Sequence, residues 1–462
     1  MSQLPKQPSA PGGNEPERGI AEHTRTLVVG PYNSRDAAAL RPEAQRLEEA
    51  VGLAQAIDLA VVRAEVARIG RPRPATLLGL GKVEEFKAAV ESEEIDLVLV
   101  DGALSPVQQR NLERAWGCKV IDRTGLILEI FGRRARTREG VLQVELAHLA
   151  YQKSRLVRSW THLERQRGGF GFLGGPGETQ IEADRRMIVE RMRRIEHDLE
   201  KVKRTRALHR AGRDRVPYPT IALVGYTNAG KSTLFNRLSS AEVLAKDMLF
   251  ATLDPTARVV ALPHGLKVIL LDTVGFISDL PTTLIAAFRA TLEDVIEADV
   301  ILHVRDLSHQ DTEAQAADVA GILTELGIDP SKAERLIEVW NKTDRIAPDE
   351  LAQMHNLVAG KPLALRPVLV SALSGAGLDI LRAEIERRIT ATRHVVSLLV
   401  EAEEGAALHW LYETCEVLAR TDAGEGRLAL QLRIPEPRWN QFARRFAGRF
   451  TTGGAEDVRA AR

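Results

Sequence analysis

The sequence predicts an α/β protein built from several domains. Strand-like and helical segments alternate from about residue 25, which is typical of a parallel α/β domain. Apolar residues then recur every seven positions, which indicates paired long helices, and a glycine-rich loop follows at Gly225–Ser232. A chain of 462 residues has room for about three domains. We expect, in order, a disordered tail (1–20), a parallel α/β domain (21–137), an antiparallel helical hairpin (138–215), a phosphate-loop α/β domain (216–394) and a small α+β domain (395–462). The elements expected in the last domain are a strand (Val395–Val400), a helix (Gly405–Leu418), a strand (Arg427–Ile434) and a helix (Arg438–Phe446).

The composition is that of a globular protein. The apolar fraction of 44% allows sizeable cores, and the formal net charge is zero. Cys118 and Cys415 match neither a zinc spacing nor a disulfide framework. No apolar run is long enough to span a bilayer, and the start of the chain lacks the apolar core of a signal peptide. We therefore expect a cytoplasmic protein without a membrane span. The tail, rich in Pro, Gly and Ser, has little to bury and is expected to be disordered.

The first domain shows four short apolar runs separated by helical patterns. The expected strands are Leu27–Gly30, Leu59–Val62, Asp96–Val100 and Lys119–Ile121. The expected helices lie around Ala37–Val51, Lys82–Glu91 and Pro106–Trp116. Because strands and helices alternate, a parallel sheet follows.

The next segment carries two heptad repeats. The first consists of Leu142, Leu149, Leu156 and Leu163, with Leu146 and Trp160 between them, and the second of Ile181, Ile188, Ile195 and Val202, with Met192 and Leu199. Two such stretches joined by a short connector predict an antiparallel helical hairpin. Lys153, Arg185 and Arg206 fall on core positions, where they either extend to the rim or mark a docking site.

The connector Gly168–Gly177 has six glycines in ten residues, interleaved with Phe170 and Phe172. Glycine allows close approach of the backbone to another surface, and an exposed Phe can stack on a base. A flexible turn whose Phe side chains fold back on the hairpin is an equal alternative. The candidate RNA contacts are Arg165, Arg167, Gly168, Gly169, Phe170, Phe172, Gly174 and Gly175.

Charge is distributed unevenly. From Arg133 to Arg215 there are 21 Lys and Arg against 11 Asp and Glu, a net of +10, so the rest of the neutral chain carries −10. Such an excess favours a nucleic-acid backbone as partner. The alternative is a solvated helix surface with many ion pairs.

The loop Gly225–Ser232 has the complete phosphate-binding pattern between the strand-like run Thr220–Val224 and the helical run Thr233–Leu238. Its backbone N–H groups and the helix N-terminus can converge on phosphate oxygens. Lys231 is expected to reach the β- and γ-phosphates, and the Ser232 hydroxyl to coordinate Mg²⁺. The candidate nucleotide contacts here are Gly225, Tyr226, Thr227, Asn228, Ala229, Gly230, Lys231, Ser232 and Thr233.

Two further segments would face the γ-phosphate. Asp272, which ends a buried strand-like run, is expected to hold Mg²⁺ through water, and the Gly275 N–H to meet the γ-phosphate. In Phe250–Thr256 one threonine should bind Mg²⁺ and sense the γ-phosphate; we expect Thr252, with Thr256 as the alternate. The contacts expected besides these are Phe250, Ala251, Thr273 and Val274.

A base-recognition segment follows at Asn341–Asp344. The Asp344 carboxylate can accept hydrogen bonds from guanine N1–H and the N2 amino group, which adenine cannot offer. Lys342 would lie along the base, Asn341 would tie this loop to the phosphate loop, and Thr343 completes the segment. The backbone of Ser371, Ala372 and Leu373 can contact guanine O6. The order of these elements predicts a guanine-nucleotide domain of the Ras-like type.

The catalytic group is not identified by the sequence. Phe276 stands where Ras-type enzymes carry the glutamine that orients water. Phenylalanine cannot hydrogen-bond to water, so we expect slow intrinsic hydrolysis that a partner stimulates, with Lys231 and Thr252 supporting the transition state.

The chain resembles the HflX family of translation-associated GTPases. The motifs that carry the resemblance are Asp122–Leu128, Arg134–Glu139, Val141–Leu146, Gly168–Gly171, Gly174–Gln180, Phe250–Thr256 and Asp272–Ile277. The resemblance implies binding to the large ribosomal subunit and its RNA, dissociation of stalled or idle ribosomes under stress, and a hairpin tip that reaches toward the peptidyl-transferase centre. We expect a monomer that uses GTP, GDP and Mg²⁺.

Some points are left open by the resemblance. Arg305 departs from the apolar residue usual at its position, and Gly79–Lys82 lacks the spacing of a phosphate loop, so a helix-capping turn is the preferred interpretation over an ATP site. The alternatives to a ribosome-splitting GTPase are a GTP-gated RNA-binding adaptor in ribosome assembly and an ATP-driven RNA remodeller, against which Asp344 argues.

Overall fold

The computed structural model describes most of the chain. The described residues are 23–33, 41–166, 176–213, 218–239, 250, 256–278, 292–330, 335–391, 393–424 and 426–452. The tail 1–20 and the hairpin tip lie outside them, with Arg167, Gly168, Gly169, Phe170, Phe172, Gly174 and Gly175, and so do Ala251, Thr252 and the side chain of Arg165. Within the described part, no helix is both long and apolar enough to cross a membrane.

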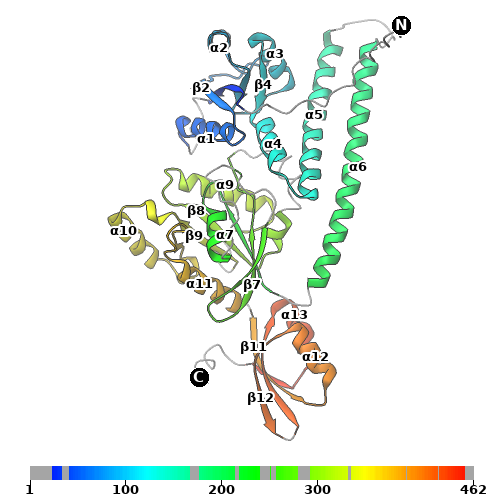
Figure 1. Cartoon of the computed structure of the whole chain (residues 1–462), viewed down its shortest axis with the longest axis vertical. Helices are drawn as coiled ribbons and strands as arrows, with labels where there is room; N and C mark the ends of the chain where they lie inside the picture. Colours follow the sequence, from blue (N-terminus) through cyan, green and yellow to red (C-terminus); the bar gives the residue numbers. More distant parts are fainter. Residues whose placement is uncertain are drawn as a thin grey trace, which may run out of the picture. The chain divides into compact units, whose positions relative to one another are not determined.

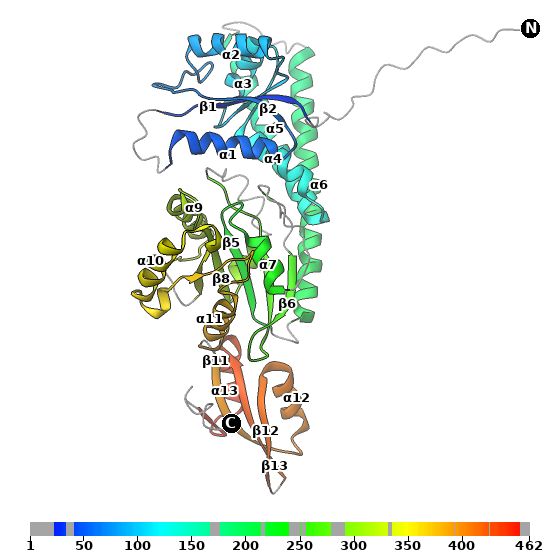
Figure 2. The same cartoon turned by 60° about the vertical axis from the view of Figure 1, so that its left-hand side comes forward.

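The N-terminal domain is a four-stranded parallel sheet in the order β2-β1-β3-β4. Its strands are β1 (Arg25–Gly30), β2 (Ala60–Val66), β3 (Leu97–Val100) and β4 (Lys119–Asp122). Its helices are α1 (Glu43–Gln55), α2 (Leu80–Ser92), α3 (Pro106–Trp116) and α4 (Arg123–Arg134). α2 and α3 cover one face of the sheet and α1 and α4 the other (Figures 1 and 2). The sheet is therefore buried on both faces, which explains its continuous apolar runs.

Local signals locate the ends of α3 well, whereas α1 begins and ends later than the expected Ala37–Val51. α3 has the predicted bounds, because Ser105 and Gln108 form a capping box at its start and Gly117 ends it with φ 69°. Gly79 is the N-cap of α2, as expected for a helix-capping turn. Lys82 pairs with Glu65 at 2.8 Å and with Glu85 at 2.9 Å.

Two long helices follow, α5 (Arg138–Gln166) and α6 (Pro176–Arg213). Val144 and Ala147 of α5 and Ile195 and Leu199 of α6 are buried. An ion pair of 2.5 Å joins Glu145 of α5 to Arg191 of α6. On α6 the two buried residues belong to the predicted heptad. On α5 the predicted Leu142, Leu146 and Leu149 are only half-buried, so the heptad does not mark the most buried positions of that helix. Arg185, which the pattern places on a core position, is exposed, and Lys153 is half-buried.

The next domain is a six-stranded sheet in the order β10-β9-β8-β5-β7-β6, parallel except for β6. Its strands are β5 (Thr220–Gly225), β6 (Thr256–Ala261), β7 (Lys267–Asp272), β8 (Val300–Asp306), β9 (Leu336–Asn341) and β10 (Val368–Leu369). Its helices are α7 (Lys231–Ser239), α9 (Thr312–Glu325), α10 (Pro348–Ala359) and α11 (Leu378–Ala391), with short 3₁₀ turns η1 (Thr343–Arg345) and η2 (Leu363–Leu365). α7 and α11 share one apolar core with the sheet (Figure 2). The segment order brings the carboxyl ends of β5, β7, β8 and β9 to one edge.

The C-terminal domain has the order β-α-β-β-α-β and an antiparallel sheet β12-β13-β11-β14. This is the split βαβ arrangement of ferredoxin-like folds. Its elements are β11 (Arg393–Glu401), α12 (Gly405–Thr414), β12 (Glu416–Gly424), β13 (Arg427–Pro435), α13 (Glu436–Arg445) and β14 (Phe450–Thr452). The α+β class is as predicted, but a helix over Gly405–Leu418 was wrong. α12 ends at Thr414 because Cys415 is extended and β12 then pairs with β13.

Candidate nucleotide site

The Gly225–Ser232 loop joins β5 to α7 and depends on two glycines with unusual backbone geometry. Gly225 has φ 154°, and a Cβ there would lie 2.2 Å from the carbonyl oxygen of Val304. Gly230 has φ 90°, and a Cβ there would lie 2.3 Å from Nδ2 of Asn341. Any side chain at either position would clash with a neighbouring strand or loop. The loop is thus held close to β8 and to the segment after β9.

Lys231 is the buried cation of the loop. It is 6% exposed, and its Nζ donates to the carbonyl oxygens of Gly225 at 3.1 Å and of Tyr226 at 2.8 Å. Burial lowers the pKa of Lys231 to about 8, although the Asp272 carboxylate opposes this shift. An anion placed in the loop would favour the charged form of Lys231. The side chain is therefore prepared for a phosphate.

Ser232 and Asp272 meet at the N-terminus of α7. The Ser232 hydroxyl donates to Oδ2 of Asp272 at 2.7 Å, and Asp272 is fully buried at the end of β7. Hydroxyl and carboxylate oxygens are ligands that Mg²⁺ prefers, but they would supply only a small part of its coordination. No cluster of three or more His, Cys, Asp or Glu suited to a metal occurs in the described ranges. This pair fits an ion that takes its other ligands from phosphate and water.

The segment after β7 is bound to the phosphate loop. Phe276 N–H donates to Gly225 at 3.1 Å, and Thr227 N–H donates to Phe276 at 2.7 Å. Gly275 fits between Thr227 and Lys231, since a Cβ there would lie 2.9 Å from Thr227 Cα and 3.0 Å from Lys231 Nζ. The Phe276 ring is 1% exposed. Its side chain is packed in the core, away from solvent.

Further contacts keep this segment in place. The Ser278 N–H donates to the hydroxyl of Tyr226 at 2.8 Å. The Thr273 hydroxyl donates to the carbonyl oxygen of Leu223 at 2.5 Å, and Val274 is buried. The Thr227 hydroxyl is buried and has no hydrogen-bond partner in the described part of the chain. A polar group in this state is available to a ligand at the loop.

Asn341 connects three segments of the site. Its Nδ2 donates to the Ala229 carbonyl at 2.9 Å, and its Oδ1 accepts from the Ala372 N–H at 3.0 Å. The side chain is 1% exposed. The amide thus couples the phosphate loop to the two segments predicted to hold the base.

The base-recognition side chains lie around Asp344. The Ser371 hydroxyl donates to Oδ1 of Asp344 at 2.5 Å, and Asp344 is itself exposed. Lys342 has φ 64° and pairs with Asp306 at 2.6 Å. Thr343 N–H donates to the Val370 carbonyl at 3.3 Å. The carboxylate of Asp344 is therefore oriented by Ser371 and open to a ligand.

Other predicted contacts are placed in part. Asn228 is exposed with φ 59°, Thr233 is half-buried in α7, and Leu373 is 68% exposed beside the site. Phe250 is buried with φ 56°, whereas Thr252 lies outside the described residues. The alternate, Thr256, begins β6 opposite Asp272 in the strand register.

Three residues of β8 that the motifs do not reveal also bear on this edge. Asp306 ends the strand and holds Lys342. His303 is buried, and burial, Arg305 and Lys231 lower its pKa to about 3, so it is neutral near pH 7. Arg305 pairs with Glu313 at 2.6 Å and with Glu338 at 3.4 Å. The only signal for Asp306 in the sequence is its place at the end of a buried strand.

Fold and site together define a P-loop GTPase, a guanine-nucleotide-binding protein with its ligand edge at the carboxyl ends of a parallel sheet. Family models match four consecutive segments. They are described as GTP-binding GTPase N-terminal (44–132), GTP-binding GTPase Middle Region (134–213), 50S ribosome-binding GTPase (220–342) and HflX C-terminal domain (364–457).

Curated relatives narrow the class to one family. The chain is 49% identical to GTPase HflX of Magnetococcus marinus, over 81% of this chain and 85% of that protein. It is 43% identical to GTPase HflX of Escherichia coli, over 81% of this chain and 86% of that protein. The chain therefore belongs to the HflX family of GTPases. A solved GTP-binding protein from Sulfolobus solfataricus, in complex with GDP, is 22% identical with a TM-score of 0.42, covering 79% of this chain and 98% of that one.

Proposed function

We propose that this GTPase binds the large ribosomal subunit and dissociates stalled or idle ribosomes, and that the ribosome stimulates its hydrolysis of GTP. The observation that carries the proposal is the match of residues 220–342 to the family described as 50S ribosome-binding GTPase. The net charge of +10 over 133–215 supports an RNA partner, because counterion release favours phosphate contacts. We further propose that the protein acts as a cytoplasmic monomer.

The nucleotide residues would act as follows. Backbone N–H groups of the loop and Lys231 would bind the phosphates, and Asp344 would select guanine. Ser232 would ligate Mg²⁺ directly, Asp272 through water, and Thr252 would complete the set in the triphosphate state. When bound, Mg²⁺ would neutralise charge on the phosphate oxygens. Lys231 would keep its charge against the γ-phosphate as the bond to the leaving group breaks.

Stimulation by a partner is proposed because Phe276 is buried and cannot orient water. The first test compares GTP turnover of the full chain alone, with small subunits and with large subunits. We expect large subunits to raise kcat by about 100-fold or more, since a catalytic group supplied by a partner raises it by about 10³- to 10⁵-fold in other GTPases. Equal, fast rates in all three reactions would contradict the proposal.

The second test addresses the hairpin tip, which contains Phe170, Phe172 and Arg167. Deleting 170–176 should abolish the splitting of whole ribosomes, measured by sedimentation, while GTP affinity stays unchanged. A matched control replaces 170–176 with seven Gly and Ser residues, which keeps the connector length but removes both rings. If splitting survives both changes, the tip is not the active element.

A GTP-gated RNA-binding adaptor in ribosome assembly is the second candidate, and the buried Phe276 favours it because slow hydrolysis suits a long-lived complex. Under that function, large subunits would bind the GTP form tightly but whole ribosomes would stay associated. The sedimentation assay separates the two functions, since only the first yields free subunits.

A further inference from the structure

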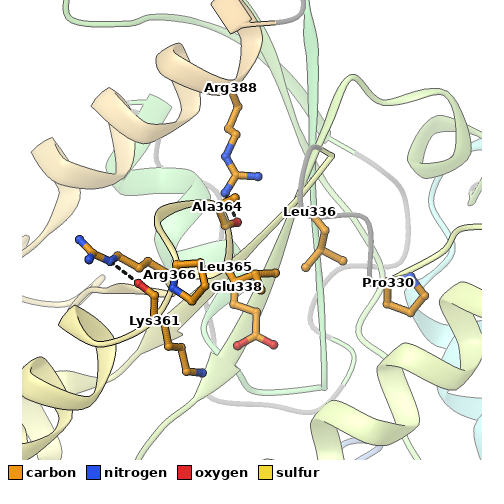
Figure 3. A pocket seen from close by; sticks show the side chains of 9 residues that line it. Pro330, Leu336, Glu338, Lys361, Ala364, Leu365, Arg366 and Arg388 are labelled. Carbon is orange, nitrogen blue, oxygen red and sulfur yellow. Dashed lines mark hydrogen bonds between the residues drawn. The ribbon is translucent and has the colours of Figure 1, made fainter.

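A second pocket lies in the GTPase domain at the β9–β10 edge of its sheet. It measures about 380 Å³ and lies among the start of β9, the turn η2 and the end of α11 (Figure 3). Leu336 and Leu365 belong to its apolar lining, and Glu338, Lys361, Arg366 and Arg388 to its polar lining. None of these residues belongs to the nucleotide segments. The pocket is thus a separate feature of the domain.

The cations of this pocket are not neutralised by carboxylates within it. Arg388 is 5% exposed; its Nε donates to Glu384 at 2.7 Å and its Nη2 to the Ala364 carbonyl at 2.7 Å. Its Nη1 is buried without a hydrogen-bond partner in the described part. Arg366 donates only to backbone carbonyls, and Lys361 forms no ion pair among the described residues. A buried donor in this state favours an acceptor brought by a ligand.

The one acidic residue of the lining is already engaged. Glu338 Oε2 accepts from the indole N–H of Trp340 at 3.0 Å and pairs with Arg305 at 3.4 Å. Lys361 lies 5.2 Å from the centre of the Trp340 ring and covers it. The rim of the pocket therefore carries a net positive charge.

Exposed leucines lie close in sequence to the cations of the pocket. Leu363 is 58% exposed and Leu365 is 55% exposed, both in η2. Leu357 on α10 is 56% exposed, and α10 has no buried residue. Exposed apolar side chains next to a pocket of mixed apolar and charged lining are typical of a protein-binding surface. Residues 361–366 thus place aliphatic side chains between two cations, Lys361 and Arg366.

We propose that this pocket binds an acidic amphipathic segment of a partner protein. One aliphatic side chain of the segment enters between Leu336 and Leu365, and its neighbouring carboxylates pair with Lys361 and Arg366. A polynucleotide is the poorer match, because base stacking needs an exposed aromatic ring. Trp340 is 7% exposed beneath Lys361, and the lining contains no aromatic side chain among the described residues.

The test uses a fluorescent twelve-residue peptide of alternating Glu and Leu, titrated with the full chain by anisotropy. Because the hairpin is basic and attracts any polyanion, only binding that depends on the pocket counts. Leu365→Ser and Lys361→Glu should each weaken binding by about tenfold, or about 1.4 kcal/mol. Ile380→Ser is the matched control, since Ile380 is 66% exposed on α11 outside the lining. It should leave the affinity unchanged.

Two comparison ligands decide the chemistry. A Glu–Ser peptide of equal charge should bind the wild type as weakly as the Glu–Leu peptide binds Leu365→Ser. A twelve-nucleotide single strand should bind wild type and Leu365→Ser equally, because it uses the hairpin. If Leu365→Ser and Lys361→Glu bind the Glu–Leu peptide as well as the wild type does, the proposal fails. If instead the oligonucleotide loses affinity in both variants, the pocket binds nucleic acid and the peptide proposal is wrong.

Discussion

The two parallel sheets of this chain place polar groups at the same structural position but use them differently. At the carboxyl ends of β3 and β4, the buried Asp101 and Asp122 are paired with Arg123 and Arg155. At the carboxyl ends of β5 and β7, glycines leave room, and among the described residues the ammonium group of the buried Lys231 donates only to carbonyl oxygens. Ligands of open α/β sheets bind at the carboxyl edge. The difference between the two edges is whether the polar groups there are already satisfied.

At the carboxyl edge of the N-terminal sheet, two carboxylates accept the available hydrogen bonds. Asp122 accepts from Gly125 N–H at 2.8 Å, Leu104 N–H at 3.2 Å, Tyr151 hydroxyl at 2.7 Å and Arg155 at 2.8 Å. A buried carboxylate with four donors has no capacity left for a ligand. Since two of these donors belong to α5, the network also fastens that helix to the edge.

Asp101 completes the pairing on the neighbouring strand. It accepts from the Tyr32 hydroxyl at 2.7 Å and from Arg123 at 2.6 Å, and Arg123 also pairs with Glu49. Burial lowers the pKa of Arg123, but the two carboxylates more than offset this effect and raise it. An edge of this kind stabilises the domain. The carboxyl edge of the N-terminal sheet lies where ligands bind in other open sheets, but this position alone is not evidence of a ligand site.

Breaking the satisfied edge should have the largest effect. Arg123→Met leaves the buried Asp101 carboxylate without its cation, while the partly buried Glu49 keeps its pair with Arg41; the change should cost about 3–5 kcal/mol of unfolding free energy. Denaturant unfolding of the full chain measures it, and Asp101→Asn added to Arg123→Met should recover part of the loss. Arg68→Met is the control, because Arg68 pairs with Glu43 while 75% exposed and should cost at most about 0.5 kcal/mol. If Arg123→Met were as stable as the wild type, the paired charges at the N-terminal edge would not stabilise the domain, and the proposed difference between the two edges would be wrong.

The second prediction concerns the nucleotide that the GTPase domain prefers. Asp344→Asn replaces a pair of acceptors with an amide donor that faces the guanine N2 amino group. GTP affinity should fall by about 100-fold or more, and xanthosine triphosphate, which has an oxygen at that position, should bind better than GTP. Competition with a fluorescent guanine nucleotide measures both. Asp349→Asn, which alters an exposed carboxylate on α10, should change neither affinity.

The third prediction follows from the buried lysine. In the nucleotide-free protein the pKa of Lys231 is about 8, against an ordinary value of 10.5, because of burial. Bound phosphates favour the charged form, so GTP binding should take up a proton above about pH 8, and affinity should fall there by up to about tenfold per pH unit. The stability of the nucleotide-free protein has the opposite sign and should rise between about pH 8 and 10.5, since the unfolded chain then binds more protons.

Calorimetry in buffers of different ionisation enthalpy, from about pH 7.5 to 9, counts the protons taken up. Lys231→Met is the control. It should bind GTP weakly at every pH and show no proton uptake in this range. Uptake that persists in Lys231→Met would assign the titration to another group.

The sequence predicts most of what depends on neighbouring residues. The phosphate loop, the strand β5 before it and α7 after it follow from one continuous pattern, and α3 has the predicted bounds because its caps are local. The structure brings together the four predicted segments around Gly230, Asp272, Asn341 and Ser371, although their roles toward a nucleotide stay predictions.

Features that depend on distant partners were not predicted. β12 was taken as the end of a helix because its pairing with β13 cannot be read from residues 416–418 alone. The network of Asp122 needs partners from three other segments, and the β9–β10 pocket joins residues 330–388. Arg305 looked like an unexplained departure for the same reason, since Glu313 follows in α9 and Glu338 lies in β9.

The smallest effect is expected at Arg305. This residue is a paired charge, but it lies in the sheet of the GTPase domain, whose carboxyl edge forms the nucleotide site. Its guanidinium lies 5.7 Å from the centre of the Trp340 ring and pairs with two carboxylates that water can reach, Glu313 at 84% and Glu338 at 34% exposure. Arg305→Leu leaves neither carboxylate buried, so the cost should be about 1 kcal/mol or less. That is well below the cost for Arg123, whose partner Asp101 is buried.

Denaturant unfolding again measures the effect, with Glu313→Gln as the control that removes one ion pair and keeps the packing of Arg305. GTP affinity should stay within about twofold in both variants, a difference of about 0.4 kcal/mol, because Asp306 still holds Lys342. If Arg305→Leu lowered the unfolding free energy by about 3 kcal/mol or more, the solvent exposure of the partner carboxylates would not explain why Arg123 and Arg305 differ. A large loss of GTP affinity would instead place Arg305 in the ligand edge, through its neighbours His303 and Asp306.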